Sequence, residues 1–405
     1  MKKGLVCSLV VFTAFILSGK LAAEGTTESP YGLSEGNEEL LLSGLKNLST
    51  HELDSALTDL KQLTERRPDF RLAQLVYADI LAAQAQGSPL SSSGSSNHHK
   101  KKIDGLISEA KVRVLMEMEK PSSNMLPADM LKLAPGQKHI IVVDTRLSRL
   151  FLFENREGVP FLVKDFYASY GRGGTGKEKR GDLKTPLGVY FITNRLEDEN
   201  LPSRYGSGAL PLNYPNVWDE RLGRTGSGIW LHGSPVETYS RPPKASEGCI
   251  SLTNPDFIDL DLEISFKDTP VLVGNNIRWI DKADWLEQRQ RFNGLIERWA
   301  ADWESLDHNR YIENYANAYS DGKRNFTQFA SYKKRVNGSK KFIDIGVNDL
   351  SLYRYPDNPD LIVATFVQDY NSSNLKGSSV KRQYWTFENN RWRIAYEGKP
   401  SQGKQ

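Results

Sequence analysis

The sequence predicts a multidomain α+β protein, with a helical N-terminal segment, a β-rich middle and a C-terminal part in which helices precede a sheet. Three observations support this fold class. Apolar residues recur at helical spacing from about residue 35 to 86, and short β-type runs divided by Gly, Pro and Asn fill residues 139–274. A second helical pattern followed by strand-like runs occupies the last third of the 405 residues.

Residues 1–23 resemble a secretory signal. Lys2 and Lys3 precede the apolar run Leu5–Leu17, and Leu21–Ala23 offers a cleavage site. The run is short for a membrane span, and an uncleaved N-terminal anchor is the alternative. We therefore expect a periplasmic protein with no stable membrane span after processing. Cleavage would remove three lysines and lower the formal charge from +3 to about 0 (3 − 3 = 0), which excludes a polybasic surface for nucleic acid.

Residues 30–130 are predicted to form a helical domain. Amphipathic helices lie on either side of the break at Arg67–Asp69, and this pair could pack on the next domain, dimerise or bind a partner. The Ser/Gly-rich, then basic, segment Gly87–Lys102 predicts a mobile loop before a helix over Ile103–Glu119. His98 and His99 have no acidic or thiol companions, so we interpret them as a solvated patch rather than a metal site.

Residues 138–275 are predicted to form a compact β sandwich or barrel-like domain. Strands are expected from His139, with turns near Thr145–Ser148 and Asn155–Gly158, and a further strand over Phe161–Ser169. Chemistry is expected in the later part of this domain, where a cysteine and a histidine lie close together in sequence.

Cys249 is one of two cysteines in the chain, and the other, Cys7, lies in the predicted signal. A single thiol in an exported protein cannot form an intrachain disulfide, so it is either a small buried residue or a reactive group. His232 is a short loop away, and an imidazole is a common means of making a thiolate nucleophile. Gly248 leaves the backbone open beside the sulfur. This combination favours a catalytic Cys–His pair.

Three phrases around this pair, Gly181–Ile192, Leu212–Gly233 and Ser246–Asp256, resemble the catalytic domain of the YkuD-type L,D-transpeptidases, which remodel peptidoglycan. The family signature has a His, about fifteen residues, then Ser/Thr-His-Gly-Cys and often an Arg two residues further on. This sequence departs from the signature at two positions. Glu247 replaces the His, and Ser251 replaces the Arg.

The resemblance implies a mechanism that needs no metal or cofactor. Cys249 would attack the carbonyl of a meso-diaminopimelate residue in a peptidoglycan stem tetrapeptide and expel D-Ala, with His232 as base and then acid. The Gly233 carbonyl would orient the imidazole, and the N–H groups of Gly248 and Cys249 would stabilise the oxyanion. We predict a transpeptidase. The alternatives are an L,D-carboxypeptidase, in which water takes the acyl group, and a non-catalytic wall-binding protein.

Five residues near the pair are candidates for substrate binding: Ser246, Glu247, Ser251, Arg224 and Tyr214. Arg224 could bind a substrate carboxylate through paired donors, and a surface ion pair is the alternative. Tyr214 could line a substrate wall, although packing is the favoured role. The phrase Thr185–Gly188 is interpreted as a turn that supports the site from beneath.

Residues 282–398 are predicted to form a C-terminal α+β domain. A helix with aromatic residues on one face is followed by Tyr311, Tyr315 and Tyr319 at intervals of four, then by strand-like runs that turn at Asn389–Asn390. This order of elements resembles the nuclear-transport-factor-like cone. The aromatic stripe is interpreted as core rather than a ligand site. The domain order resembles that of the helical-cell-shape L,D-carboxypeptidases. The N- and C-terminal domains could bind wall glycan or a protein partner.

Overall fold

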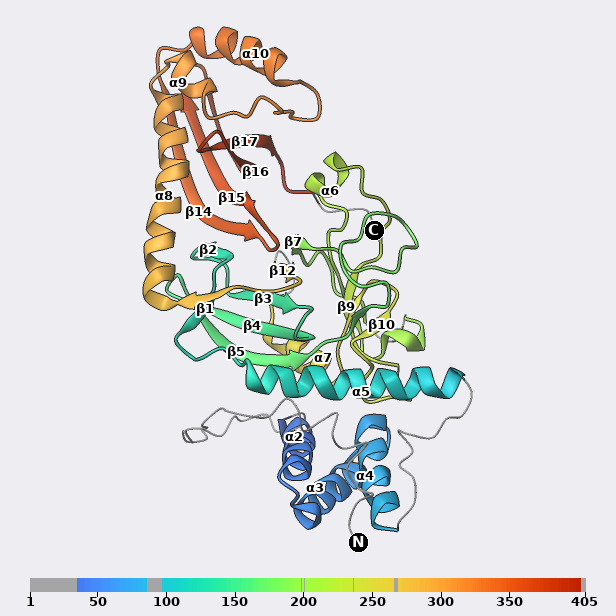
Figure 1. Ribbon diagram of the computed structural model, residues 1–405. Coiled ribbons are helices and arrows are strands. Elements are labelled where there is room, and N and C mark those ends of the chain that lie inside the picture. Colours follow the sequence, from blue (N-terminus) through green and yellow to red (C-terminus); the bar gives the residue numbers. More distant parts are fainter. Residues whose placement is uncertain are drawn as a thin grey trace.

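The computed structural model describes residues 35–85, 97–197, 199, 201–235, 237–265 and 269–401. Three regions follow one another in space as they do in sequence (Figure 1), and their types confirm the predicted fold class. The predicted signal over residues 1–23 lies outside the described residues, as does most of the predicted loop. In the described part of the chain, no helix is both long and apolar enough to cross a membrane.

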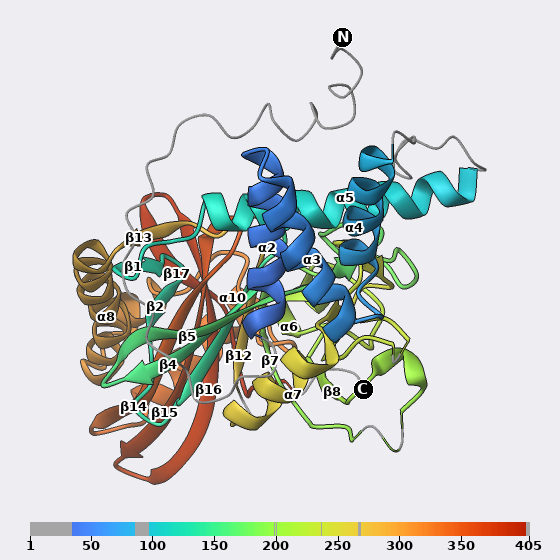
Figure 2. The ribbon, with the colours of Figure 1, turned by 90° about the horizontal axis from the view of Figure 1, so that it is seen from below.

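The N-terminal region is a small helical domain. Its short helices lie against the long helix α5, which runs along the base of the next domain (Figures 1 and 2). Its core is made mainly of leucines and alanines from these helices and includes Phe70 and Ile80. The bounds are α2 Glu35–Ser49, α3 Leu53–Arg66, α4 Arg71–Gln84 and α5 Asn97–Met118. The prediction of a loop as far as Lys102 is wrong at its end, because α5 begins at Asn97.

The middle region contains a five-stranded sheet of order β5-β4-β3-β12-β7. Its hairpins turn where the sequence predicted. The strand β12, which is far from β3 in sequence, pairs with it in parallel. The bounds are β3 His139–Asp144, β4 Arg149–Arg156, β5 Val159–Tyr167, β7 Gly188–Phe191 and β12 Pro270–Gly274.

A second, three-stranded sheet of order β11-β9-β8 carries the candidate site. Apolar residues of both sheets, including Ile141, Val271, Leu231 and Ile250, belong to one core that holds the second sheet in place. A two-residue parallel pair, β6 with β10, lies beside it. The bounds are β6 Tyr170–Gly171, η3 Ser203–Tyr205, β8 Ala209–Pro211, α6 Val217–Arg221, β9 Trp230–His232, β10 Lys244–Ser246, β11 Ile250–Ser251 and α7 Asn254–Glu263.

The C-terminal region is a long antiparallel sheet with helix α8 along one face (Figure 1). Trp299, Trp385 and Phe366 are fully buried between α8 and the sheet. Tyr315 and Tyr319 lie beyond the end of α9, so the fourfold spacing of tyrosines does not mark a helix, yet both rings are buried in this core. The bounds are α8 Lys282–Glu304, α9 His308–Ile312, α10 Phe326–Gly338, β14 Ile343–Tyr355, β15 Asn358–Ser372, β16 Leu375–Glu388 and β17 Arg391–Gly398.

Short strands join the middle and C-terminal regions. β1 (Met125–Pro127) pairs with β13 (Trp279–Asp281), and β2 (Met130–Lys132) extends the C-terminal sheet beside β14. The Tyr355 hydroxyl at the end of β14 accepts a hydrogen bond from the Asn216 side chain (2.9 Å). These contacts attach the C-terminal sheet to the domain that carries the candidate site.

Candidate active site

Two adjacent parallel strands bring the predicted nucleophile and base together. β9 ends at His232, and Cys249 lies directly before β11, whose register places Ser251 opposite His232. Cys249, two residues earlier than Ser251, is therefore beside Trp230. Side chains two positions apart on a strand point to the same face. The sulfur and the imidazole accordingly share one face of the sheet.

The imidazole of His232 is held in the tautomer that a general base requires. Its Nδ1 lies 2.6 Å from the Gly233 carbonyl oxygen, and because a carbonyl can only accept, Nδ1 carries the proton. The Ser251 hydroxyl donates to the same oxygen (3.1 Å). The Tyr205 ring meets the imidazole edge to face, with centroids 5.1 Å apart. Nε2 is thereby left with a free lone pair.

Burial keeps the His232 imidazole and the Cys249 thiol neutral near pH 7. It lowers the pKa of His232 to about 4, although the hydrogen bond to Gly233 acts in the opposite direction. Burial also raises the pKa of the Cys249 thiol to about 11. The backbone N–H of Trp230 and the charges of Arg241 and Arg204 act in the opposite direction and lower this pKa. A neutral imidazole beside a neutral thiol is therefore the resting state near pH 7.

The thiol of Cys249 is nearly enclosed. The residue is 9% exposed, and Sγ donates a hydrogen bond to the Gly228 carbonyl (3.3 Å) rather than to His232. Catalytic hydrogen bonds are often absent or long before substrate binds.

The turn before Cys249 is held by two hydroxyl groups. Ser246 Oγ donates to the Cys249 carbonyl (2.6 Å) and accepts from the Gly248 N–H (3.1 Å). Thr185 donates to the Gly248 carbonyl (2.9 Å). Gly248 has φ +127°, and a Cβ there would lie 2.8 Å from the Lys184 carbonyl oxygen, so glycine is required. Thr185 thus supports the site from beneath, as its phrase predicted.

These bonds change the predicted oxyanion donors. The Gly248 N–H is occupied by Ser246, so in this conformation it is not available to an oxyanion, contrary to the prediction. Ser246 itself is 2% exposed and holds the turn instead of facing substrate. The N–H of Cys249 is the other predicted donor and stays the candidate.

The other predicted substrate-binding residues lie in different surroundings. Tyr214 is fully buried against Tyr190 (centroids 5.9 Å apart), so it has the packing role that the sequence favoured and does not line a substrate wall. Arg224 forms an ion pair with the buried Asp219 (2.8 Å), which is the alternative that the sequence left open. Ser251 is buried, and its hydroxyl donates to the Gly233 carbonyl, as described above. Glu247 alone is exposed, in an ion pair with Arg172 (3.2 Å).

Sequence reasoning missed the loop that joins His232 to Cys249 and the arginine that it carries. The Arg241 guanidinium donates to the Ala245 carbonyl (2.5 Å), and the Arg241 carbonyl accepts from the Tyr167 hydroxyl (2.7 Å). The adjacent Ser240 hydroxyl donates to the buried Glu109 of α5 (2.6 Å). The N-terminal helices therefore pack on this domain and hold the loop. The local signal for this loop in the sequence was a positively charged residue between His232 and Cys249.

Two parts of the chain match known family models. Residues 138–273 match the YkuD family, described as an L,D-transpeptidase catalytic domain. This region is a YkuD L,D-transpeptidase domain. Residues 291–398 match the Cds6 C-terminal NTF2-like domain, so the YkuD domain is followed by an NTF2-like domain, as the resemblance implied. A search of curated proteins found no match.

Solved structures share this combination of domains. Bdellovibrio bacteriovorus Bd1075 is 26% identical, with a TM-score of 0.61 over 69% of this chain and 100% of that chain. The helical cell shape determining protein Pgp2 of Campylobacter jejuni is 23% identical, with a TM-score of 0.58 over 70% of this chain and 98% of its own. A point mutant of Pgp2 matches with 22% identity, a TM-score of 0.58, and coverage of 72% and 97%. These likenesses to Pgp2 support a common fold.

Proposed function

We propose that this protein is a cysteine L,D-transpeptidase that acts on the meso-diaminopimelate–D-Ala bond of peptidoglycan stem tetrapeptides. The observation that carries the proposal is the parallel pairing of β9 with β11, which places Cys249 and His232 on one face with Gly233 bound to Nδ1. The YkuD domain supports the substrate class.

The proposed first step is acylation of Cys249. His232 Nε2 removes the thiol proton as Sγ attacks the diaminopimelate carbonyl carbon, and the Cys249 N–H faces the developing oxyanion. The C–N bond then breaks, the imidazolium gives its proton to the leaving amine, and D-Ala departs. The product is a thioester between Cys249 and the shortened stem peptide.

The acceptor decides the outcome of the second step. A diaminopimelate amine would form a cross-link, and water would release a tripeptide. A specific observation favours hydrolysis as the second candidate: Cys249 is only 9% exposed, and water enters an enclosed site more easily than a second stem peptide. Control of cell shape is part of the proposal because the structurally similar Pgp2 is a helical cell shape determining protein.

Incubation of the purified protein with disaccharide-tetrapeptide tests the proposal. Cross-linked dimer indicates a transpeptidase, and tripeptide without dimer indicates a carboxypeptidase. Unchanged substrate with measurable binding would mean a wall-binding protein and would overturn the proposed chemistry. A periplasmic location follows from this substrate, and cell fractionation with an antibody to the protein tests it separately.

A further inference from the structure

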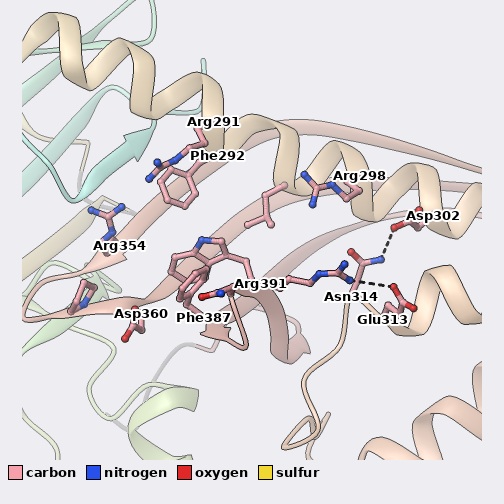
Figure 3. Close-up of a pocket in the computed structure, with 14 residues that line it drawn as sticks. Arg291, Phe292, Arg298, Asp302, Glu313, Asn314, Arg354, Asp360, Phe387 and Arg391 are labelled. Atoms are coloured by element: carbon pink, nitrogen blue, oxygen red, sulfur yellow. Dashed lines mark hydrogen bonds and ion pairs between the residues drawn. The ribbon is translucent and has the colours of Figure 1, made fainter.

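The NTF2-like domain contains an open groove that the proposed reaction does not use. The groove has a volume of about 720 Å³ and lies between α8, the segment after α9 and the ends of the hairpins β14–β15 and β16–β17 (Figure 3). We name it the α8 groove and define it by the residues that carry the argument: Arg291, Arg298, Arg354, Arg391, Phe387 and Trp392. Its size is within the usual range of small-ligand sites, about 300–1,000 Å³.

Positive charge exceeds negative charge in the α8 groove once internal pairs are removed. Four arginines and three carboxylates line it. Asp302 is already bound by Arg310 (2.9 Å) and by the Asn314 amide (2.9 Å). The pair between Glu313 and Arg391 is long (3.5 Å) and its side chains are 65% and 66% exposed, so it is weak and exchangeable.

The remaining arginines form no ion pair with any described residue. Arg291 and Arg298 are exposed on α8. Arg354 is only 8% exposed, and its guanidinium makes one long hydrogen bond, to Gln288 (3.4 Å). Its Nε has no partner in the described part of the chain. A buried donor without an acceptor is uncommon in folded proteins, and a bound acceptor would explain it.

Aromatic rings form the middle of the α8 groove. Phe387 is 41% exposed, and Trp392 packs against it with centroids 5.3 Å apart. In Figure 3, Arg291 and Arg354 lie on one side of Phe387, and Arg298 and Arg391 lie on the other. Two cationic ends are thus separated by an apolar centre.

We propose that the α8 groove binds a short acidic peptide, with one carboxylate at Arg291 and Arg354 and a second at Arg298 and Arg391. Guanidinium groups match carboxylates through paired N–H donors. Asp360 and Asn390 also line the groove and can accept hydrogen bonds from peptide N–H groups. This proposal rests on the groove and does not require the catalytic reaction.

Calorimetry with the full chain tests the proposal. The probe is a synthetic Glu-Ala-Ala-Glu peptide with blocked ends, and the matched neutral probe is Gln-Ala-Ala-Gln. We expect saturable one-site binding of the acidic peptide, weaker by about tenfold or more for the neutral peptide and for the R291Q/R298Q variant. R335Q on α10 is the matched control, because it removes an exposed charge outside the groove and should leave binding unchanged.

Several results would overturn the proposal. These are equal binding of both peptides, equal binding by R291Q/R298Q and the wild type, or no saturation at millimolar peptide. Competition by inorganic phosphate as effective as that by the acidic peptide would point to a different ligand. If circular dichroism shows that R291Q/R298Q does not fold, R391Q replaces it. This substitution lies at the exposed end of the hairpin and should weaken binding of the acidic peptide in the same way. Catalytic inactivity would leave these results unaffected, so the two proposals can fail separately.

Discussion

The Cys249 site and the α8 groove differ in the burial and the charge of their polar groups. At Cys249 the thiol and the His232 imidazole are buried and neutral, and their neighbours are backbone carbonyls and hydroxyls. In the α8 groove most of the charged groups are exposed, and Arg354 has an unmatched donor. Burial suits a proton that moves during reaction, whereas recognition of a charged ligand needs charges that water still reaches.

The largest expected effect separates the two regions. Cys249→Ala should abolish thioester formation and lower the rate of tripeptide or dimer formation by at least about 10³-fold, because no other thiol is present in the described chain. Binding of the Glu-Ala-Ala-Glu probe should not change. Chromatography of the reaction products and calorimetry measure the two. Loss of both functions together would contradict the division between the regions.

Removal of the base should have the next largest effect. His232→Gln keeps a side chain of similar size but cannot accept the thiol proton at neutral pH, so the rate should fall by about 10²–10⁴-fold. His139→Gln is a control outside the site. Turnover of His232→Gln within a few fold of the wild type would show that another group activates the thiol.

A third prediction concerns charges that are both buried and paired. Arg113 is 3% exposed and forms ion pairs with Glu109 (3.0 Å) and Glu38 (3.1 Å). Glu109 accepts a hydrogen bond from Ser240 and so attaches α5 to the loop between His232 and Cys249. Arg113→Ala should lower the free energy of unfolding by about 3–5 kcal/mol, because the buried Glu109 loses its ion-pair partner and Glu38 keeps only Arg149 (2.8 Å). Urea denaturation measures this, and Arg335→Ala, at an exposed position, should cost less than about 1 kcal/mol.

The pH dependence should reflect the buried imidazole. Protonation of His232 removes the base, and because its pKa is lowered to about 4, kcat/KM should stay high from pH 8 to 5 and fall only near pH 4. Because the pKa of His232 in the folded protein lies below the ordinary value of 6.5, the neutral imidazole contributes to the free energy of unfolding, in full above pH 6.5. This contribution is lost as the pH falls toward 4. A rate that halves near pH 6.5 would contradict the burial argument.

The smallest expected effect is at Ser251. Ser251→Ala removes one of the two donors to the Gly233 carbonyl and leaves the Nδ1 bond in place. One hydrogen bond of about 1 kcal/mol corresponds to about a fivefold loss in kcat/KM. Ser251→Thr keeps the hydroxyl and should retain most of the activity. A loss as large as that of His232→Gln would give Ser251 a direct part in the chemistry.

Much of the fold followed from local patterns, and the exceptions have physical causes. The hairpins from His139 and the turn at Asn389–Asn390 were predictable, because alternating apolar residues and turn-forming residues act over a few positions. The helical start at Asn97 was not, since a Ser/Gly-rich and basic stretch resembles a linker. The parallel pairing of β12 with β3 depends on contacts far apart in sequence.

The contrast between local sequence patterns and long-range contacts also applies to the two sites. Cys249 and His232 lie within one short stretch, so their residue types and spacing were enough to predict a catalytic pair, which stays a prediction. The burial of Tyr214 and the pairing of Arg224 with Asp219 depend on packing that spacing does not reveal. The α8 groove draws its arginines from α8, β14 and the β16–β17 hairpin, and no single segment marks it.

Direct detection of the covalent intermediate is the most decisive measurement. The wild-type protein is mixed with disaccharide-tetrapeptide, quenched in acid within seconds, and digested for mass spectrometry. We predict an adduct on the peptide that contains Cys249, with the mass of the donor less D-Ala, and a smaller amount of adduct in His232→Gln. Product formation with no adduct on Cys249, or product formation by Cys249→Ala at the wild-type rate, would contradict the account.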